Sequence, residues 1–328
     1  MSDPGRDATV GNASSSQQWV PRPPLRQARG GLEVVTIDGK ILAIGGFKGE
    51  DVFPDVEVRR TMGHGSWSNL HPMKVGRANF AAAVVRGRVY AVGGIDVHSN
   101  GRDVVEVFDM AKNHWATSVP LPLPRDSAGA AELHGLLYVA GGSVTLGDNK
   151  FETTDSVLVF NPDDGSWRPV APLRVPRQKL RVVTSGRHLY AIGGQAPTGE
   201  TVTTVERYDP ESGSWTTMNP MHESRALFGV VQTTVGHRRL LVVVGGSEVG
   251  VGETTSVARR TTEVFDIESG SWRLLGVLLP TKRGSNECAV EEGGSIVTIG
   301  GVTSLDGKPK FLSDVDALHL TPHHWPGR

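Results

Sequence analysis

Six pairs of adjacent glycines, each closing an apolar run, recur along this sequence of 328 residues. The pairs are evenly spaced, and a fixed period of about 50 residues is typical of arrays in which each repeat is one supersecondary unit that packs only against its neighbours. The repeat therefore overrides the chain length, which alone would suggest two domains. The pairs are Gly45-Gly46, Gly93-Gly94, Gly141-Gly142, Gly193-Gly194, Gly245-Gly246 and Gly300-Gly301.

Tryptophan keeps almost the same period. The first four tryptophans each precede the next glycine pair by an identical interval, and Trp215 and Trp272 precede theirs by a slightly longer one. Each repeat thus has a glycine pair and an aromatic side chain at nearly fixed relative positions. The tryptophans are Trp19, Trp67, Trp115, Trp167, Trp215, Trp272 and Trp325.

Each repeat offers four short strands, here named a to d. In the second repeat, strand a is the apolar run Ala81–Val85, strand b is Arg88–Val92, strand c is Val104–Phe108, and strand d carries Trp115. Turn residues such as Arg86-Gly87 separate the strands. One such sheet cannot bury both of its faces alone. The sequence therefore predicts radial packing of the repeats about a common axis.

The repeats contain the strings RVYAVGG…VVEVFDMAKNHW, HLYAIGG…TVERYDPESGSW and LVVVGG…TTEVFDIESGSW. This pattern resembles the kelch repeat, and the resemblance covers the chain from about Trp19 to the C-terminus. It implies an all-β fold, a six-bladed kelch β-propeller with four-stranded antiparallel blades. Kelch propellers are known as protein-interaction modules, and a minority act on small molecules.

We predict a disordered tail over residues 1–16 and a single propeller over 17–328. Residues 17–21, around Trp19, are expected to close the sixth blade. Trp325 competes for that place, but only three residues follow it and the first is Pro326, which weakens a strand. The expected blades are approximately 29–70, 77–118, 125–170, 177–218, 225–275 and 283–325.

Composition narrows the possible partners. The formal net charge is −1 and no basic stripe is present, so we expect no nucleic-acid binding. No uncharged apolar run approaches the roughly 20 residues needed to span a bilayer. The segment Met1–Gln18 has no apolar core of a secretory signal, so we expect a cytoplasmic protein. A closed ring leaves few open sheet edges, and we expect a monomer.

We expect neither a metal nor a cofactor. His319, His323 and His324 cluster near the C-terminus, but their spacing matches no zinc site. Cys288 is the only cysteine, which excludes an intramolecular disulfide, and it has no evident tyrosine partner for copper oxidase chemistry. The sequence has no P-loop, dinucleotide fingerprint or nucleophile elbow.

Function is expected on one face of the ring. Because neighbouring strands alternate in direction, the b–c and d–a connections lie on the same face, which we call the loop face. The b–c connections over 143–154, 247–262 and 302–313 are long, whereas the turns of the opposite face are short. Insertions on one face of a repeat fold often mark its binding face, although loop length also varies wherever the fold tolerates insertions.

Two sets of residues are candidates for binding on the loop face. An arginine ends each d–a connection; it either binds a carboxylate or phosphate or, as is common in kelch repeats, braces adjacent blades. The residue after each glycine pair follows strand b onto the same face, and in kelch domains that bind peptides both sets line a shallow pocket. The arginines are Arg29, Arg77, Arg125, Arg177, Arg225 and Arg283. The residues after the glycine pairs are Phe47, Ile95, Ser143, Gln195, Ser247 and Val302, half apolar and half polar.

Strand a suggests a second site, in the channel. Four residues after the arginine, three repeats have alanine or glycine, whereas the others have Glu33, Arg181 and Glu287. Blades 1 and 6 are neighbours and blade 4 lies across the channel, so the two carboxylates are expected to face Arg181. Such a pair can perform acid–base chemistry or form a structural ion cluster.

A binding module that recognises a protein or peptide through the loop face is the function predicted first. The alternative is a small-molecule enzyme in the central funnel, without metal. It would be a sugar mutarotase-like isomerase or catalyse a biosynthetic cyclisation or rearrangement, with a small polar or anionic ligand and Glu33, Arg181 and Glu287 as catalytic candidates.

Overall fold

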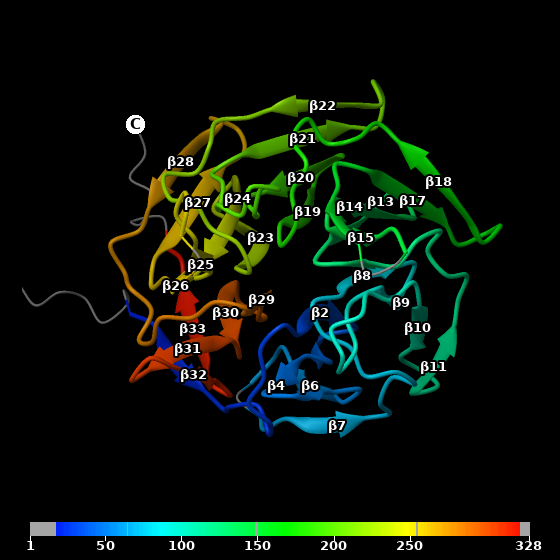
Figure 1. Ribbon diagram of the computed structural model, residues 1–328. Helices are drawn as coiled ribbons and strands as arrows, with labels where there is room; N and C mark the ends of the chain where they lie inside the picture. The colour runs from blue at the N-terminus through cyan, green and yellow to red at the C-terminus, as the bar shows by residue number, and fades with distance from the viewer. Residues whose placement is uncertain (1–17, 64, 148–149, 254, 322–328) are drawn as a thin grey trace, which may run out of the picture.

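The computed structural model describes residues 18–63, 65–147, 150–253 and 255–321. These residues form six four-stranded antiparallel sheets arranged radially around a central axis, with strand a innermost (Figure 1). Each sheet is ordered a-b-c-d, as the sequence predicts. The all-β fold class is confirmed.

The bounds of the strands, from a to d, are as follows. Blade 1 contains β2 (Glu33–Ile37), β3 (Lys40–Ile44), β6 (Val56–Arg60) and β7 (Ser68–Leu70). Blade 2 contains β8 (Ala81–Val85), β9 (Arg88–Val92), β10 (Val105–Asp109) and β11 (His114–Thr117). Blade 3 contains β13 (Gly129–Leu133), β14 (Leu136–Ala140), β17 (Val157–Asn161) and β18 (Ser166–Val170). Blade 4 contains β19 (Arg181–Ser185), β20 (His188–Ile192), β21 (Val205–Asp209) and β22 (Ser214–Thr217). Blade 5 contains β23 (Gly229–Val235), β24 (Arg238–Val244), β27 (Thr262–Asp266) and β28 (Ser271–Leu274). Blade 6 contains β29 (Glu287–Val290), β30 (Ser295–Ile299), β33 (Val315–His319) and β1 (Val20–Arg22).

Strand d of blade 6 comes from the start of the described chain. In this pairing β1 lies antiparallel to β33, with Val20 opposite Ala317. Glu291, in the a–b turn of blade 6, holds the junction with blade 1. Its carboxylate lies 2.7 Å from Arg59 Nη2 and 3.2 Å from Arg22 Nε. The expected tail over 1–16 and the competing Trp325 lie outside the described residues.

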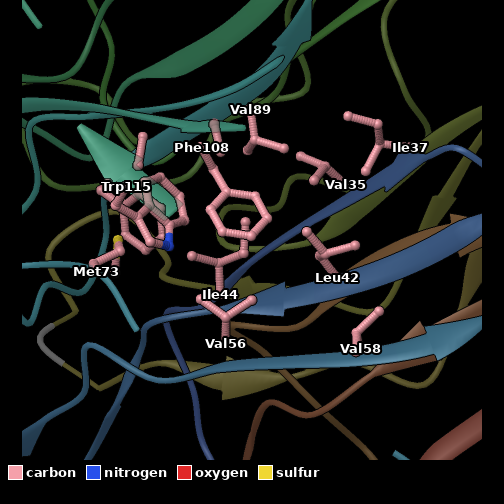
Figure 2. Close-up of a cluster of buried hydrophobic side chains, with 13 residues drawn as sticks. Val35, Ile37, Leu42, Ile44, Val56, Val58, Met73, Val89, Phe108 and Trp115 are labelled. Carbon is pink, nitrogen blue, oxygen red and sulfur yellow. The ribbon is translucent and has the colours of Figure 1, made fainter. Parts of the chain in front are cut away.

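The core lies between the sheets, in one apolar cluster for each pair of neighbouring blades. In β3, Leu42 and Ile44 pack towards blade 2, whereas Ile41 and Ala43 pack towards blade 6. Figure 2 shows the first of these clusters, in which Leu42 and Ile44 lie near Phe108 of blade 2. Since side chains alternate along a strand and both faces are covered, strand b is apolar at successive positions.

The glycine pairs lie where the backbones of neighbouring blades meet, and blade 2 shows this clearly. Gly93 has a φ of +64°, and a Cβ there would lie 2.1 Å from the carbonyl oxygen of Arg125 in the next blade. The Gly94 amide donates to that same oxygen at 2.8 Å. Glycine is therefore required because the backbone of one blade touches the start of the next.

The tryptophans of strand d in blades 2, 4 and 5 link neighbouring blades, because each packs on its own blade and donates a hydrogen bond to the connection from the preceding blade. The Trp115 indole lies 4.9 Å from the ring of Phe108 on strand c, and its Nε1 donates to the His71 carbonyl at 3.1 Å. Trp215 and Trp272 donate in the same way to Ala171 and Asn219 in the connections that precede their blades. These tryptophans have packing roles.

Most of the long b–c connections fold into small β-ribbons on the loop face. The pairings in blades 1 and 5 are two residues long, and those in blades 3 and 6 are longer. The ribbons are β4–β5 (Phe47–Lys48, Asp51–Val52), β15–β16 (Ser143–Thr145, Phe151–Thr153), β25–β26 (Ser247–Glu248, Val257–Ala258) and β31–β32 (Val302–Leu305, Lys308–Phe311), with β12 (Arg125–Asp126) alongside β15.

The part of the chain that the structure describes contains no helix long and apolar enough to cross a membrane.

Candidate functional site

All six residues that follow the glycine pairs lie on the loop face, each paired with the residue after its blade arginine. Antiparallel pairing of this kind joins the b–c connection of a blade to the d–a connection that leads into it. Five of the six side chains are half-buried, and Ser143 is buried. The pairs are Gly30 with Phe47, Ala78 with Ile95, Asp126 with Ser143, Gln178 with Gln195, Ala226 with Ser247, and Gly284 with Val302.

The six blade arginines are buried below that face. Each is at most 5% exposed. Five of them form an ion pair with the acidic second residue of strand c in the same blade. The pairs are Arg29–Glu57, Arg77–Glu106, Arg177–Glu206, Arg225–Glu263 and Arg283–Asp316.

Each arginine brace also includes the backbone. In blade 2, Arg77 Nη1 donates to the carbonyl oxygens of Gly93 and Val104, and the Glu106 carboxylate accepts the Lys74 amide at 2.7 Å. Burial lowers the pKa of Arg77, against the opposing effect of Glu106. The guanidinium therefore joins strands b and c to the d–a connection. Arg77 is only 1% exposed, so its guanidinium is not accessible to a ligand on the loop face.

Blade 3 departs from this pattern. Arg125 Nη2 donates to Ser156 Oγ at 2.7 Å where the other blades have a carboxylate. Burial lowers the pKa of Arg125 to about 10. Pro122 stands three residues before Arg125, the position at which Lys74 in blade 2 supplies an amide to the carboxylate. The carboxylate and one of its amide donors are absent together in this blade.

These contacts do not favour a ring of guanidiniums open to ligand, which was one of the two interpretations. We propose that Arg29, Arg77, Arg125, Arg177, Arg225 and Arg283 brace the blades, which was the other interpretation. The sequence identified the position correctly but could not show the carboxylate of strand c as its partner, because each appears separately as an ordinary charged residue.

Glu33, Arg181 and Glu287 meet in the channel. Each is the first residue of its strand a. Arg181 Nη1 lies 2.6 Å from Glu33 Oε1, Nη2 contacts Glu287, and Nε donates to the Phe228 carbonyl at 2.9 Å. Arg181 thus bridges the channel between two carboxylates and uses every nitrogen of its guanidinium.

The surroundings of this cluster are tight. Burial raises the pKa of Glu33, although the nearby Arg181 opposes that shift. The pocket above Glu33 and Arg181 encloses about 10 Å³, which is room for about one water molecule. The geometry provides an ion cluster across the channel, and the pocket that Glu33 and Arg181 line has no room for a substrate.

The raised pKa of Glu33 predicts a pH effect on stability. Because the folded state takes up a proton at a pH where the unfolded chain does not, the wild type should gain stability relative to Glu33→Gln as pH falls through the raised pKa towards the ordinary range of glutamate. Urea unfolding of both proteins from about pH 8 to about pH 5 measures this difference. A difference that stays constant across the range would contradict it.

A ring of six residues around the channel mouth was missed by the sequence analysis. We call it the mouth ring; each member stands two residues after its blade arginine and has a positive φ. Each backbone amide donates to the carbonyl of the preceding member, from Asn79 to Gly31 at 3.0 Å and finally from Gly31 to Ser285 at 3.2 Å. The members are Gly31, Asn79, Ser127, Lys179, Leu227 and Ser285. The fixed offset from the arginine was the available signal, but the residue types vary too much to reveal it.

Lys179 and Asp126 bring charge to the mouth. Lys179 Nζ donates to Gln195 Oε1 at 2.7 Å, and Asp126 accepts the Ser127 hydroxyl at 2.7 Å. Burial lowers the pKa of Lys179 and raises that of Asp126, and each charge partly offsets the shift of the other. This polar side of the mouth spans blades 3 and 4, where the sequence predicted polar residues.

The apolar side of the mouth holds a larger pocket. It has a volume of about 520 Å³ and lies between the connections of blades 5, 6 and 1. Three of the predicted binding residues, Phe47, Ser247 and Val302, line it, together with Leu227 of the mouth ring and Phe311 of β32. The structure thus brings these three together; Ile95, Ser143 and Gln195 do not line this pocket.

No group of three or more His, Cys, Asp or Glu side chains among the described residues could hold a metal ion. His319 lies in β33, whereas His323 and His324 lie outside the described residues. Cys288 is buried in β29, and burial raises the pKa of its thiol to about 12. A thiol with this pKa stays protonated and is a poor nucleophile.

Radial four-stranded sheets, glycine pairs at the blade junctions and paired connections on one face define a kelch-type β-propeller. The model of the Attractin/LZTR1 β-propeller family matches residues 89–326, and the chain belongs to this family. The predicted resemblance is confirmed.

Two curated relatives that the chain resembles are Kelch-like proteins. The chain is 26% identical over 187 residues to Kelch-like protein 34 of Homo sapiens and 24% identical over 181 residues to Kelch-like protein 41b of Danio rerio. These alignments cover 53% and 54% of this chain and 28% of each relative, so the chain spans under a third of their length. The solved structure of YjhT matches with a TM-score of 0.74 at 16% identity, covering 90% of this chain and 95% of that one, which shows the fold alone.

Proposed function

We propose that this propeller is a protein-binding module that recognises its partner through the loop face. The proposal keeps the expectation of a monomer that binds neither nucleic acid nor membrane. The Kelch-like relatives support a module of this class. The distribution of exposed apolar side chains supports the choice of this face.

Large apolar side chains are exposed mainly in the connections of the loop face. Val251 is 87% exposed, Leu305 57% and Phe151 53%, and all three lie in b–c connections. Only Met62 lies in a turn of the opposite face among the large exposed apolar residues of the described chain. Exposed apolar groups that gather on one face of a soluble domain typically mark an interaction surface. This asymmetry is the observation that carries the proposal.

The alternative enzyme has less support. Its catalytic candidates Glu33, Arg181 and Glu287 are bonded to each other, with room for about one water beside them. A small anionic ligand lacks support as well, because the arginines expected to bind it are buried in braces. The loop face instead offers an uncharged pocket and exposed apolar side chains, which suit a protein surface.

The proposal is tested by affinity capture from the organism that encodes this chain. Immobilised wild type is compared with Phe151→Glu/Val251→Glu/Leu305→Glu on the loop face and with Met62→Glu on the opposite face. We expect a partner that wild type and Met62→Glu retain in near-stoichiometric amount and that the triple variant loses. A partner retained equally by the triple variant, or no saturable partner, would contradict binding through this face.

A further inference from the structure

We propose that the pocket between blades 5, 6 and 1 binds an uncharged aromatic or large aliphatic side chain from an extended segment of the partner. This inference rests on the proposed function and specifies where on the loop face the partner is anchored and by what chemistry.

The pocket is built by three connections from different blades. Phe47 follows the glycine pair of blade 1, Ala258 belongs to β26 of blade 5, and Val302 and Phe311 face each other across the ribbon of blade 6. The rings of Phe47 and Phe311 meet edge to face with their centroids 5.3 Å apart. Aromatic edges and faces of this kind favour a further apolar or aromatic group against them.

The absence of charged residues from the pocket indicates which side chains can occupy it. The lining residues include no Asp, Glu, Lys, Arg or His. Burying a charged side chain in such a site would be unfavourable because no opposite charge there would offset the hydration that it loses. A neutral apolar anchor carries no such cost and gains from the area removed from water.

Hydroxyl groups also line the pocket. Ser247, Ser285 and Thr303 come from blades 5 and 6 and line the same space. Hydroxyls both donate and accept hydrogen bonds, so they can satisfy the backbone amides and carbonyls that flank an inserted side chain. A mainly apolar lining with a few polar groups is the usual composition of a binding pocket, and about 520 Å³ lies within the usual range of volumes.

The conformation of Leu227 is a further observation at this pocket. Leu227 has a φ of +54°, a left-handed conformation that bulky residues rarely adopt. The mouth ring holds it there, because its amide donates to Lys179 and its carbonyl accepts from Ser285. Leu227 lines both the channel mouth and the large pocket, so the strained residue forms part of the apolar wall.

The apolar surface continues beyond the pocket. Val257 of β26 and Leu305 of β31 are 53% and 57% exposed, and β26 lies beside β31 (Figure 1). A partner segment anchored in the pocket would therefore extend over apolar side chains of the two neighbouring ribbons. This continuity is expected of an interface in which one buried anchor is surrounded by weaker contacts.

The test uses a phage-displayed library of random linear peptides, selected on the wild-type protein. We expect the enriched peptides to share an uncharged aromatic or large aliphatic residue. Their affinity is then measured on two matched variants in the same ribbon. Ser304 of β31 lines the pocket and Lys310 of β32 does not, so Ser304→Trp should fill the space and weaken binding about tenfold or more, whereas Lys310→Trp should change it by less than about threefold.

Ser256→Trp, which fills the pocket from the blade 5 connection, repeats the test if Ser304→Trp does not fold. The inference is overturned if no peptide is enriched, if the shared residue is charged, or if both filling variants bind as tightly as wild type. Affinity capture separates the two proposals. A natural partner retained by the filling variants but lost by the loop-face triple variant overturns the pocket and leaves the proposed function standing.

Discussion

Replacing Glu106 with alanine should lower the free energy of unfolding by about 3–5 kcal/mol, because it leaves the buried Arg77 guanidinium without its counter-charge. Both side chains of this ion pair are 1% exposed. The substitution also removes the acceptor of the Lys74 amide. Removing one partner of a buried pair costs more than the pair itself contributes, since the remaining charge stays desolvated.

Urea unfolding of Glu106→Ala and of Ser156→Ala compares this loss with the loss of the neutral partner of a blade arginine. Ser156 contacts Arg125 in blade 3 as the carboxylates do elsewhere, but it is neutral. Its loss should cost about 1.5–3 kcal/mol, the usual contribution of one hydrogen bond to a charged group. Equal losses for the two variants would mean that the carboxylates are not what neutralises the blade arginines.

Gly93→Ala should be comparably damaging, at about 3–5 kcal/mol from a left-handed backbone and overpacking together. The added Cβ would lie 2.1 Å from the Arg125 carbonyl oxygen. A backbone atom cannot rotate away as a flexible side chain can. The junction between blades 2 and 3 would have to open, which would also disturb the hydrogen bond from the Gly94 amide to that oxygen.

Gly87→Ala is the control for Gly93→Ala. Gly87 also has a positive φ, +72°, but no atom lies within 4 Å of a Cβ built there. It should therefore cost only the conformational part, about 1–2 kcal/mol. Thermal or urea unfolding of both variants separates the close contact from the backbone strain. Similar losses at the two positions would show that the junction relaxes freely.

The two predictions concern the same part of the fold and bear on binding. Arg125 begins blade 3, and Ser127 of the mouth ring follows it by two residues. Glycine pairs and arginine braces therefore fix where each blade presents its mouth residue. A binding surface assembled from six separate connections needs such rigid junctions, because its geometry depends on the position of every blade.

The sequence alone determined the all-β propeller of the kelch class. Apolar strands such as 88–92, the turns between them and the recurring glycine pair with its tryptophan are local signals, and neighbouring repeats supply the contacts that bury each blade. The same spacings within the repeat predicted which connections form the loop face. They also predicted that Glu33, Arg181 and Glu287 would face one another in the channel, as they do.

Only the tertiary structure decided what those positions do. Arg77 and Glu106 are 29 residues apart, and no local pattern shows that they neutralise each other below the surface. The pocket combines Phe47 with Phe311, which are distant in the chain and meet only because the ring closes between blades 6 and 1. Strand and turn signals depend on neighbouring residues, whereas burial, ion pairing and the shape of a pocket depend on which distant blades come together.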